Sequence, residues 1–164
     1  MMDAGRYDFR IELPIRNEWE NIERVRVSVL EFFVAVFHDV HGCRSLANVA
    51  GELMENAMKY GDWSASETHL YLRICGDDAR ARVEVQSPID PAAPELGELL
   101  DTLAWLRATP DARAAFESRI LAAAARPPGQ AKLGLTRVAY EGGCTIEASV
   151  DGRTLTVLAS RTFP

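Results

Sequence analysis

The 164-residue chain has few cysteines, no excess of basic residues and no long apolar run. Its three cysteines, Cys43, Cys75 and Cys144, lie far apart without a Cys-x-x-Cys pair or a Cys/His cluster, which argues against a disulfide framework and a zinc site. A net charge of -6 and a pI near 5.1 argue against sequence-independent binding to nucleic acid or to an anionic membrane. No segment has transmembrane length and the N-terminus lacks an apolar signal region, so we expect a cytoplasmic protein without nucleic-acid or membrane partners.

The sequence does contain enough apolar material for one hydrophobic core. Hydrophobic residues make up 48% of the chain and charged residues 26%. This length and composition are typical of one soluble globular domain, and no internal repeat or low-complexity segment divides the chain. We therefore treat residues 1–164 as a single domain.

Alternating apolar residues predict about five strands. Each has apolar residues on one face only, which is typical of half-buried strands. Gly76-Asp77-Asp78 and Asp151-Gly152 carry hairpin-turn signals. The pattern predicts a mixed, mostly antiparallel sheet with one face in water and the other covered by helices. The predicted strands are 6–13, 68–74, 81–85, 144–150 and 155–159.

Helical periodicity fills the rest of the chain. A long amphipathic helix capped by Asn17 is expected up to Phe37, and its broad Val/Phe surface is either buried or shared with a partner. His38, His41 and Gly42 are expected to form a loop. Further helices are predicted at 44–60, 95–107, 111–125 and 133–140, so the fold class is an α+β two-layer sandwich with a helical insert at about 94–126.

The most informative stretch is ELMENAMKYG, at the end of the second predicted helix. Glu52, Asn56 and Lys59 follow one another at helical spacing and therefore share a face beside an apolar stripe. Asn is a poor residue for a helix interior unless its side chain has a partner. The spacing can also arise by chance, and Lys59 can equally be a solvated lysine.

The order of elements, together with Glu52 and Asn56, resembles the histidine-kinase-like ATPase superfamily, known as GHKL. The most similar members in character are the bacterial anti-sigma-factor serine kinases and the SiaB-family kinases. The resemblance implies ATP and Mg²⁺ as cofactors, with Asn56 holding the metal and Glu52 acting as the catalytic base. Lys59 would lie near the phosphates, and the insert at 94–126 would occupy the position of the ATP lid.

The two glycine motifs of the family match unequally. In GQAKLGLTRV, Gly134 and Leu135 match the second motif, whereas Lys132 replaces its first glycine. The first motif, Asp-x-Gly-x-Gly after the third strand, is replaced by VEVQSPIDPAAP. Gln86 or Ser87 occupies the position of its Asp, and Gln86 could offer an amide oxygen to adenine.

Two functional hypotheses follow from the resemblance. In the first, the chain is an ATP-binding serine/threonine kinase-like regulator of a bacterial partner-switching system, acting on a small antagonist domain of STAS type. In the second, it keeps the fold, has lost adenine binding, and regulates through protein contact alone, with a homodimer as a further candidate partner. A third, plainer interpretation is an α+β domain in which Asn56 only caps a buried loop.

Overall fold

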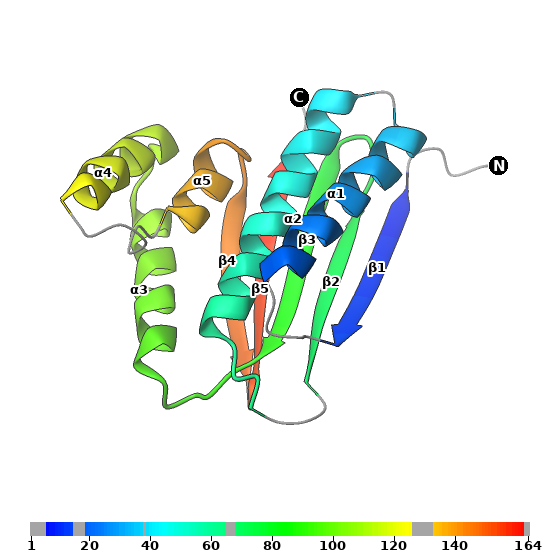
Figure 1. The fold of residues 1–164 in the computed structure, drawn as a ribbon. Coiled ribbons are helices and arrows are strands. Elements are labelled where there is room, and N and C mark those ends of the chain that lie inside the picture. Colours follow the sequence, from blue (N-terminus) through cyan, green and yellow to red (C-terminus); the bar gives the residue numbers. More distant parts are fainter. Residues whose placement is uncertain (1–5, 15–18, 38, 65–67, 126–132, 163–164) are drawn as a thin grey trace.

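A computed structural model describes residues 6–14, 19–37, 39–64, 68–125 and 133–162. These residues form five helices and five strands, arranged as in Figure 1. Asn17, His38, Gly129 and Lys132, all considered above, lie outside the described residues. The elements are β1 (Tyr7–Pro14), α1 (Trp19–Val36), α2 (Val40–Tyr60), β2 (His69–Gly76), β3 (Arg80–Pro88), α3 (Pro94–Ala108), α4 (Ala112–Ala124), α5 (Gly134–Tyr140), β4 (Thr145–Asp151) and β5 (Thr154–Thr162).

The strands form one open sheet in the order β1-β2-β3-β5-β4. All four pairings of the described strands are antiparallel, including β3 with β5, which are separated by three helices in the chain. The predicted α+β sandwich is therefore confirmed, with a sheet that is antiparallel throughout its described part rather than mixed.

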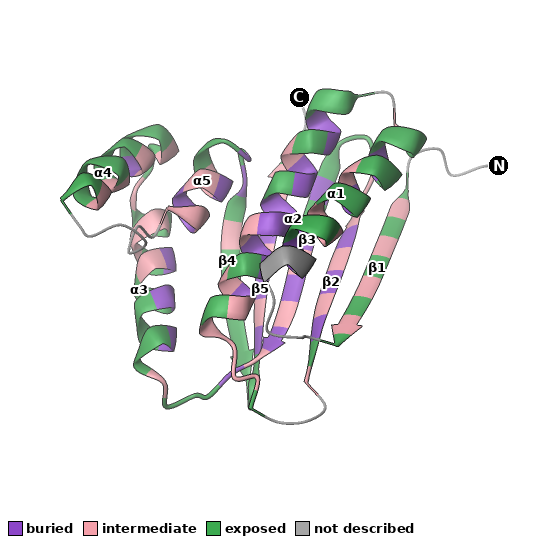
Figure 2. Ribbon diagram, viewed as in Figure 1, coloured by how far each residue is buried: buried purple, intermediate pink, exposed green. Residues whose placement is uncertain are grey.

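Strand alternation determines which face of the sheet meets the helices. In β3, Ala81, Val83 and Val85 are buried, while the residues between them are exposed or half-buried. Figure 1 shows α1 and α2 crossing one face of the sheet, and Figure 2 shows buried residues on α2 and on the strands behind it. The other face carries charge, such as the Asp8 carboxylate held by Arg10 and Arg73.

Aromatic side chains join α1 to β1. Phe33 is fully buried, and its ring contacts those of Tyr7 and Phe9 at centroid distances of 5.5 and 5.8 Å. Val36 is 56% exposed on the outer side of α1, whereas Phe32 is 45% exposed and its ring contacts that of Phe9 on β1 at 4.8 Å. The broad apolar surface of this helix is thus buried on one side only, and a partner for its outer side stays a prediction.

Helix α2 begins four residues earlier than predicted, at Val40 rather than at Arg44. Asp39 caps it, because its carboxylate accepts a hydrogen bond of 3.0 Å from the backbone N–H of Gly42. His41 and Gly42 therefore belong to the first turn of α2, and the expected loop is wrong at these two residues. His and Gly are common in loops, so the residue types at 41 and 42 do not indicate the helix start that Asp39 provides.

The predicted helical insert is present as α3 and α4. Leu96, Leu99 and Leu103 bury one side of α3 against the core. Phe116 of α4 contacts Tyr140 of α5 at a ring distance of 5.4 Å, so α4 packs on α5. Figure 1 shows the insert standing beside the β4 side of the sheet. No helix in the described ranges has the length and apolar character needed to cross a membrane.

Candidate functional site

A polar cavity of about 360 Å³ lies between α2, α3 and α5. This volume is within the range of small-molecule sites, roughly 300–1,000 Å³. Five of the six residues proposed from the sequence line it, namely Glu52, Asn56, Lys59, Gly134 and Leu135. The remaining lining residues are Glu55, Tyr60, Leu99, Thr102, Leu133 and Arg137.

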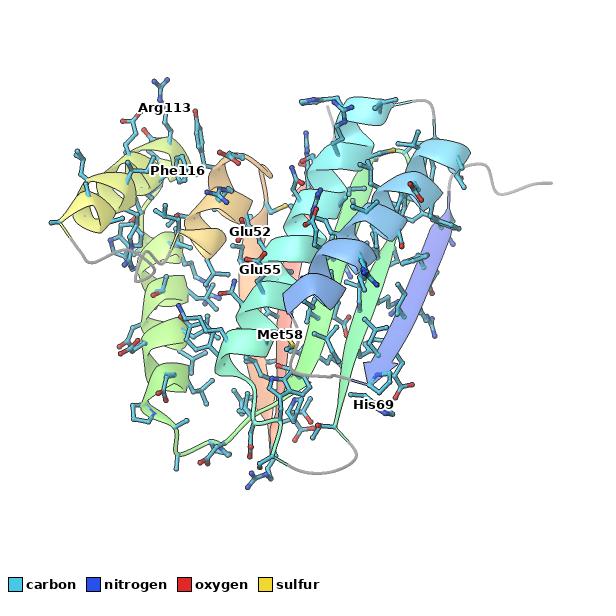
Figure 3. All side chains as sticks on the ribbon, in the orientation of Figure 1. Glu52, Glu55, Met58, His69, Arg113 and Phe116 are labelled. Atoms are coloured by element: carbon cyan, nitrogen blue, oxygen red, sulfur yellow. The ribbon has the colours of Figure 1, made fainter. Side chains whose placement is uncertain are left out.

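Helix α2 places its polar residues at the cavity because its neighbouring stripe is anchored in the core. Ala50 and Leu53 are at most 1% exposed, and Ala57 is 5% exposed. With this stripe buried against the sheet, the turn-spaced Glu52 and Asn56 are directed to the adjacent side, toward α5. Figure 3 shows Glu52 and Glu55 on α2 beside α5.

The side-chain amide of Asn56 lines the cavity. Its side-chain Nδ2 donates a hydrogen bond of 3.0 Å to the backbone carbonyl of Glu52, one turn earlier in the helix. This bond orients the amide, and it leaves Oδ1 without a hydrogen-bond partner among the described residues. An amide oxygen is a ligand type that Mg²⁺ accepts.

Glu52 is ion-paired with a residue that the sequence analysis missed. Arg137 of α5 donates through Nη1 to Glu52 Oε1 at 2.7 Å. The Glu52 side chain is 17% exposed and that of Arg137 is 43% exposed, so the pair lies at the cavity wall with the cation on its outer side. A signal was present in the sequence, because Arg137 follows Gly134 by one helical turn and so shares its side of α5.

Gly134 allows α5 to approach α2 closely. A Cβ atom at this position would lie 2.6 Å from Glu52 Oε2 and 3.5 Å from Asn56 Nδ2. The Glu52 carboxylate therefore lies where a side chain at position 134 would begin, and only glycine leaves room for it. The next residue, Leu135, is only 5% exposed, so it contributes to the core as well as to the cavity wall.

Four charged residues line the cavity, and they balance in sign. Glu52 and Glu55 face Lys59 and Arg137. Partial burial raises the pKa of Glu55 above its ordinary value, and the nearby Glu52 charge raises it further. The Lys59 ammonium lies 5.5 Å from the centre of the Tyr60 ring, so this lysine is at the edge of the cavity and makes a cation–π contact.

Gln86 is not brought to the cavity. It lies on the opposite face of the sheet from the helices, because its strand neighbour Val85 is buried beneath them. Its Nε2 donates to Glu84 Oε1 at 2.6 Å on that same face. Ser87, which is 3% exposed, occupies the helix-covered face instead. The alternation of Val83 and Val85 could have indicated this from the sequence.

The segment after β3 is held by hydrogen bonds to two other parts of the chain. The Asp62 N–H donates to the Pro88 carbonyl, and the Ile89 N–H donates to the Arg153 carbonyl, each at 2.8 Å. The Arg153 side chain also pairs with Asp62 at 2.8 Å. Ile89 itself is 1% exposed, so core packing occupies this position.

The search against protein-family models found no match, and the search of curated proteins found no significant match. The family resemblance thus remains a hypothesis that depends on Glu52, Asn56 and Gly134. Within the described ranges, no three His, Cys, Asp or Glu side chains gather into a metal site. A magnesium ion held mainly by phosphate and water oxygens requires few protein ligands, and Asn56 is the candidate among the described residues.

Proposed function

We propose that the protein is an ATP-binding, serine/threonine kinase-like regulator of a bacterial partner-switching system, acting in the cytoplasm. The observation that carries the proposal is that Glu52, Asn56, Lys59 and Gly134 line the same polar cavity. Its substrate would be a Ser or Thr hydroxyl of a small STAS-like antagonist domain. Phosphoryl transfer depends chiefly on positioning and on charge stabilisation, which a small domain of this kind can provide.

The cavity fits the magnesium-bound phosphate end of a nucleotide. Asn56 Oδ1 is free of other described partners and would bind Mg²⁺, while Lys59 would attract the phosphates as a point charge. The missing side chain at Gly134 lets the α5 backbone lie close to Glu52 at the cavity wall. When bound, Mg-ATP supplies the phosphoryl group and the metal neutralises part of its charge.

In this proposal Glu52 would accept the proton of the acceptor hydroxyl. Oε1 is engaged by Arg137, whereas Oε2 is the oxygen nearest to Gly134. A carboxylate of low exposure within hydrogen-bond reach of the hydroxyl can act as a general base. Glu52 is therefore expected to matter for transfer more than for nucleotide binding.

The experiment is isothermal titration of the protein with Mg-ATP, followed by a transfer assay with a STAS-like domain as acceptor. The wild type should bind Mg-ATP at millimolar concentration or below, and Glu52→Gln should bind it while losing transfer by roughly 100-fold or more. Glu141→Gln, on the far side of Arg137, serves as a control and should retain transfer. Absence of heat from Mg-ATP and Mg-ADP at millimolar nucleotide would refute the proposal.

A second candidate, a nucleotide-free regulator that acts by protein contact, is favoured by the segment after β3. Gln86 faces away from the cavity, and Ile89 fills the core where the first glycine motif would otherwise open a site for adenine. The outer surface of α1, which includes Val36, then offers a surface for a STAS-like partner or a second copy. For this candidate, partner binding should persist in Asn56→Ala and weaken in Val36→Ser, as measured by titration without nucleotide.

A further inference from the structure

Arg137 lines two neighbouring hollows in the protein surface. Besides the polar cavity, it lines a groove formed with Glu23, Arg26 and Asn48 on the outer side of α2. Its Nη1 donates to Glu52, and its Nε lies 3.7 Å from Glu141 Oε2, which is a looser contact. The guanidinium therefore has one short bond, to a carboxylate that the proposed mechanism needs as a base.

We propose that Arg137 exchanges between two anionic partners, the Glu52 carboxylate and a phosphate group bound in the cavity. The inference rests on the proposed function in one respect, that the cavity accepts phosphate groups, and it does not require phosphoryl transfer. In the first arrangement Arg137 is paired with the Glu52 carboxylate. In the second, Arg137 binds the phosphate, and the carboxylate is free to accept a proton. Arg137 is thereby a positioning residue that makes Glu52 competent when a phosphate is present.

The exposure of the two partners determines which of them can move. Arg137 is 43% exposed and Glu52 is 17% exposed, so the cation can shift with little change in its burial while the carboxylate stays in place. A guanidinium presents a planar set of N–H donors that matches two oxygens of a phosphate. Because both partners line the same cavity, a phosphate entering it competes with Glu52 for this one side chain.

The charge balance of the cavity makes the exchange favourable. A phosphate group entering beside Glu52 and Glu55 is repelled by both carboxylates. Lys59, at the cavity edge, offsets part of this repulsion, and Arg137 is the second cation of the wall. Transfer of Arg137 to the anion places the cation between phosphate and carboxylate, where it screens one from the other.

The test uses inorganic pyrophosphate as the probe, titrated into the intact protein. Arg137→Gln should weaken its binding by about tenfold or more, since charge-assisted hydrogen bonds are lost, and Arg137→Lys should restore part of the affinity. Glu52→Gln should strengthen binding by several-fold, because it removes a competing carboxylate. Glu52→Gln should strengthen binding less in the Arg137→Gln background than in the wild type, because only the direct repulsion is then relieved. Arg153→Gln, which breaks an ion pair of similar length away from the cavity, should bind as the wild type does.

A spectroscopic readout separates exchange from a structural role. The NMR signals of the Arg137 Nη–H groups, which include the donor to Glu52, should shift on adding pyrophosphate, and in Glu52→Gln they should start near their free positions. Equal pyrophosphate affinity of the wild type, Glu52→Gln and Arg137→Gln would overturn the exchange while leaving the cavity as a phosphate site. If no folded variant binds pyrophosphate at millimolar concentration, the exchange and the phosphate site are both refuted. If pyrophosphate binds and Mg-ATP does not, the exchange stands and the kinase proposal fails.

Discussion

The two ends of the expected nucleotide site differ sharply. At the α2 end, Glu52, Asn56 and Gly134 come together around one cavity from segments about 80 positions apart in the chain. At the β3 end, Gln86 faces the other side of the sheet and Ile89 is buried in the core. The α2 end has the features of a binding site, whereas the segment after β3 is packed into the core.

Side-chain direction can be predicted more safely from helical spacing than from single positions in a strand. Residues four apart on a helix stay on one face even if the boundary of the helix moves, as it did for α2. Neighbouring residues of a strand point to opposite faces, so choosing Gln86 over Ser87 reverses the predicted direction. Variants at each end of the site, and at the residues that hold α5 in place, test this contrast.

Ile89→Ala should have the largest effect, lowering the free energy of unfolding by about 2–5 kcal/mol, because it leaves a cavity at a fully buried position. Ile120→Ala on α4 removes the same atoms from a side chain that is 43% exposed and should cost less than about 1 kcal/mol. Urea unfolding of both variants measures the difference. Equal costs would mean that Ile89 is not packed in the core.

Asn56→Ala should abolish stabilisation by Mg-ATP, which amounts to about 2.7 kcal/mol when the ligand is at 100 times its dissociation constant. Without ligand, its stability should change by less than about 1 kcal/mol, because the lost hydrogen bond is offset by the helix propensity of Ala. Asn48→Ala, on the same helix and outside the cavity, is the control. Thermal unfolding with and without Mg-ATP separates this outcome from the plainer interpretation, in which Asn56 affects stability alone.

Cys144 tests the attachment of α5 to the sheet. It follows α5, its N–H donates to the Val138 carbonyl at 3.4 Å, and burial raises the pKa of its thiol to about 11. An unfolded thiol titrates near pH 8.5, so the unfolded chain loses its proton first as the pH rises, and stability falls from about pH 8.5 upward.

The loss attributable to Cys144 should reach about 1–2 kcal/mol near pH 10, and Cys144→Ala should remove it. Cys43, whose pKa is also raised by burial, should account for a smaller part of the slope. Urea unfolding across this pH range gives the result. If the pH dependence of stability is unchanged in Cys144→Ala, the thiol is solvated and the contact between α5 and β4 is not tightly packed.

Gly134→Ala tests the contact between α5 and Glu52. Its Cβ would lie 2.6 Å from Glu52 Oε2, so the carboxylate must shift, and the coupling with Glu52→Ala should be about 1 kcal/mol. Gly97→Ala on α3 meets no atom within 4 Å and should instead stabilise the protein by about 0.5–1 kcal/mol. A double-mutant cycle measured by urea unfolding gives the coupling. Strictly additive effects would place the two residues farther apart than the structure has them.

Gln86→Ala should have the smallest effect, changing both stability and Mg-ATP affinity by less than about 0.5 kcal/mol. Its side chain bonds only to Glu84 on the face away from the cavity, among the contacts of the described residues. Titration with Mg-ATP measures the affinity. A tenfold or greater loss of Mg-ATP affinity would mean that Gln86 belongs to the nucleotide site after all. The two ends would then both contribute to binding.

Most of the fold could be predicted because its patterns are local. Alternation located all five described strands, and helical spacing located the helices to within a few residues, apart from the Asp39 cap. The Glu52–Arg137 pair could not be predicted in the same way, because it joins α2 to α5 across 85 positions and depends on how the helices pack. The meeting of Gly134 with Glu52 likewise needed the tertiary structure, although Gly134 itself was selected from the motif.

The order β1-β2-β3-β5-β4 has a consequence for how the chain folds. The pairings β2–β3 and β4–β5 join consecutive strands, whereas β3–β5 joins strands separated by α3, α4, α5 and β4. The β1–β2 pairing also closes a long loop, through α1 and α2, and the cost of loop closure rises only slowly with length. We therefore expect the β2–β3 and β4–β5 hairpins to form first, and the two non-local pairings, β1–β2 and β3–β5, to form late.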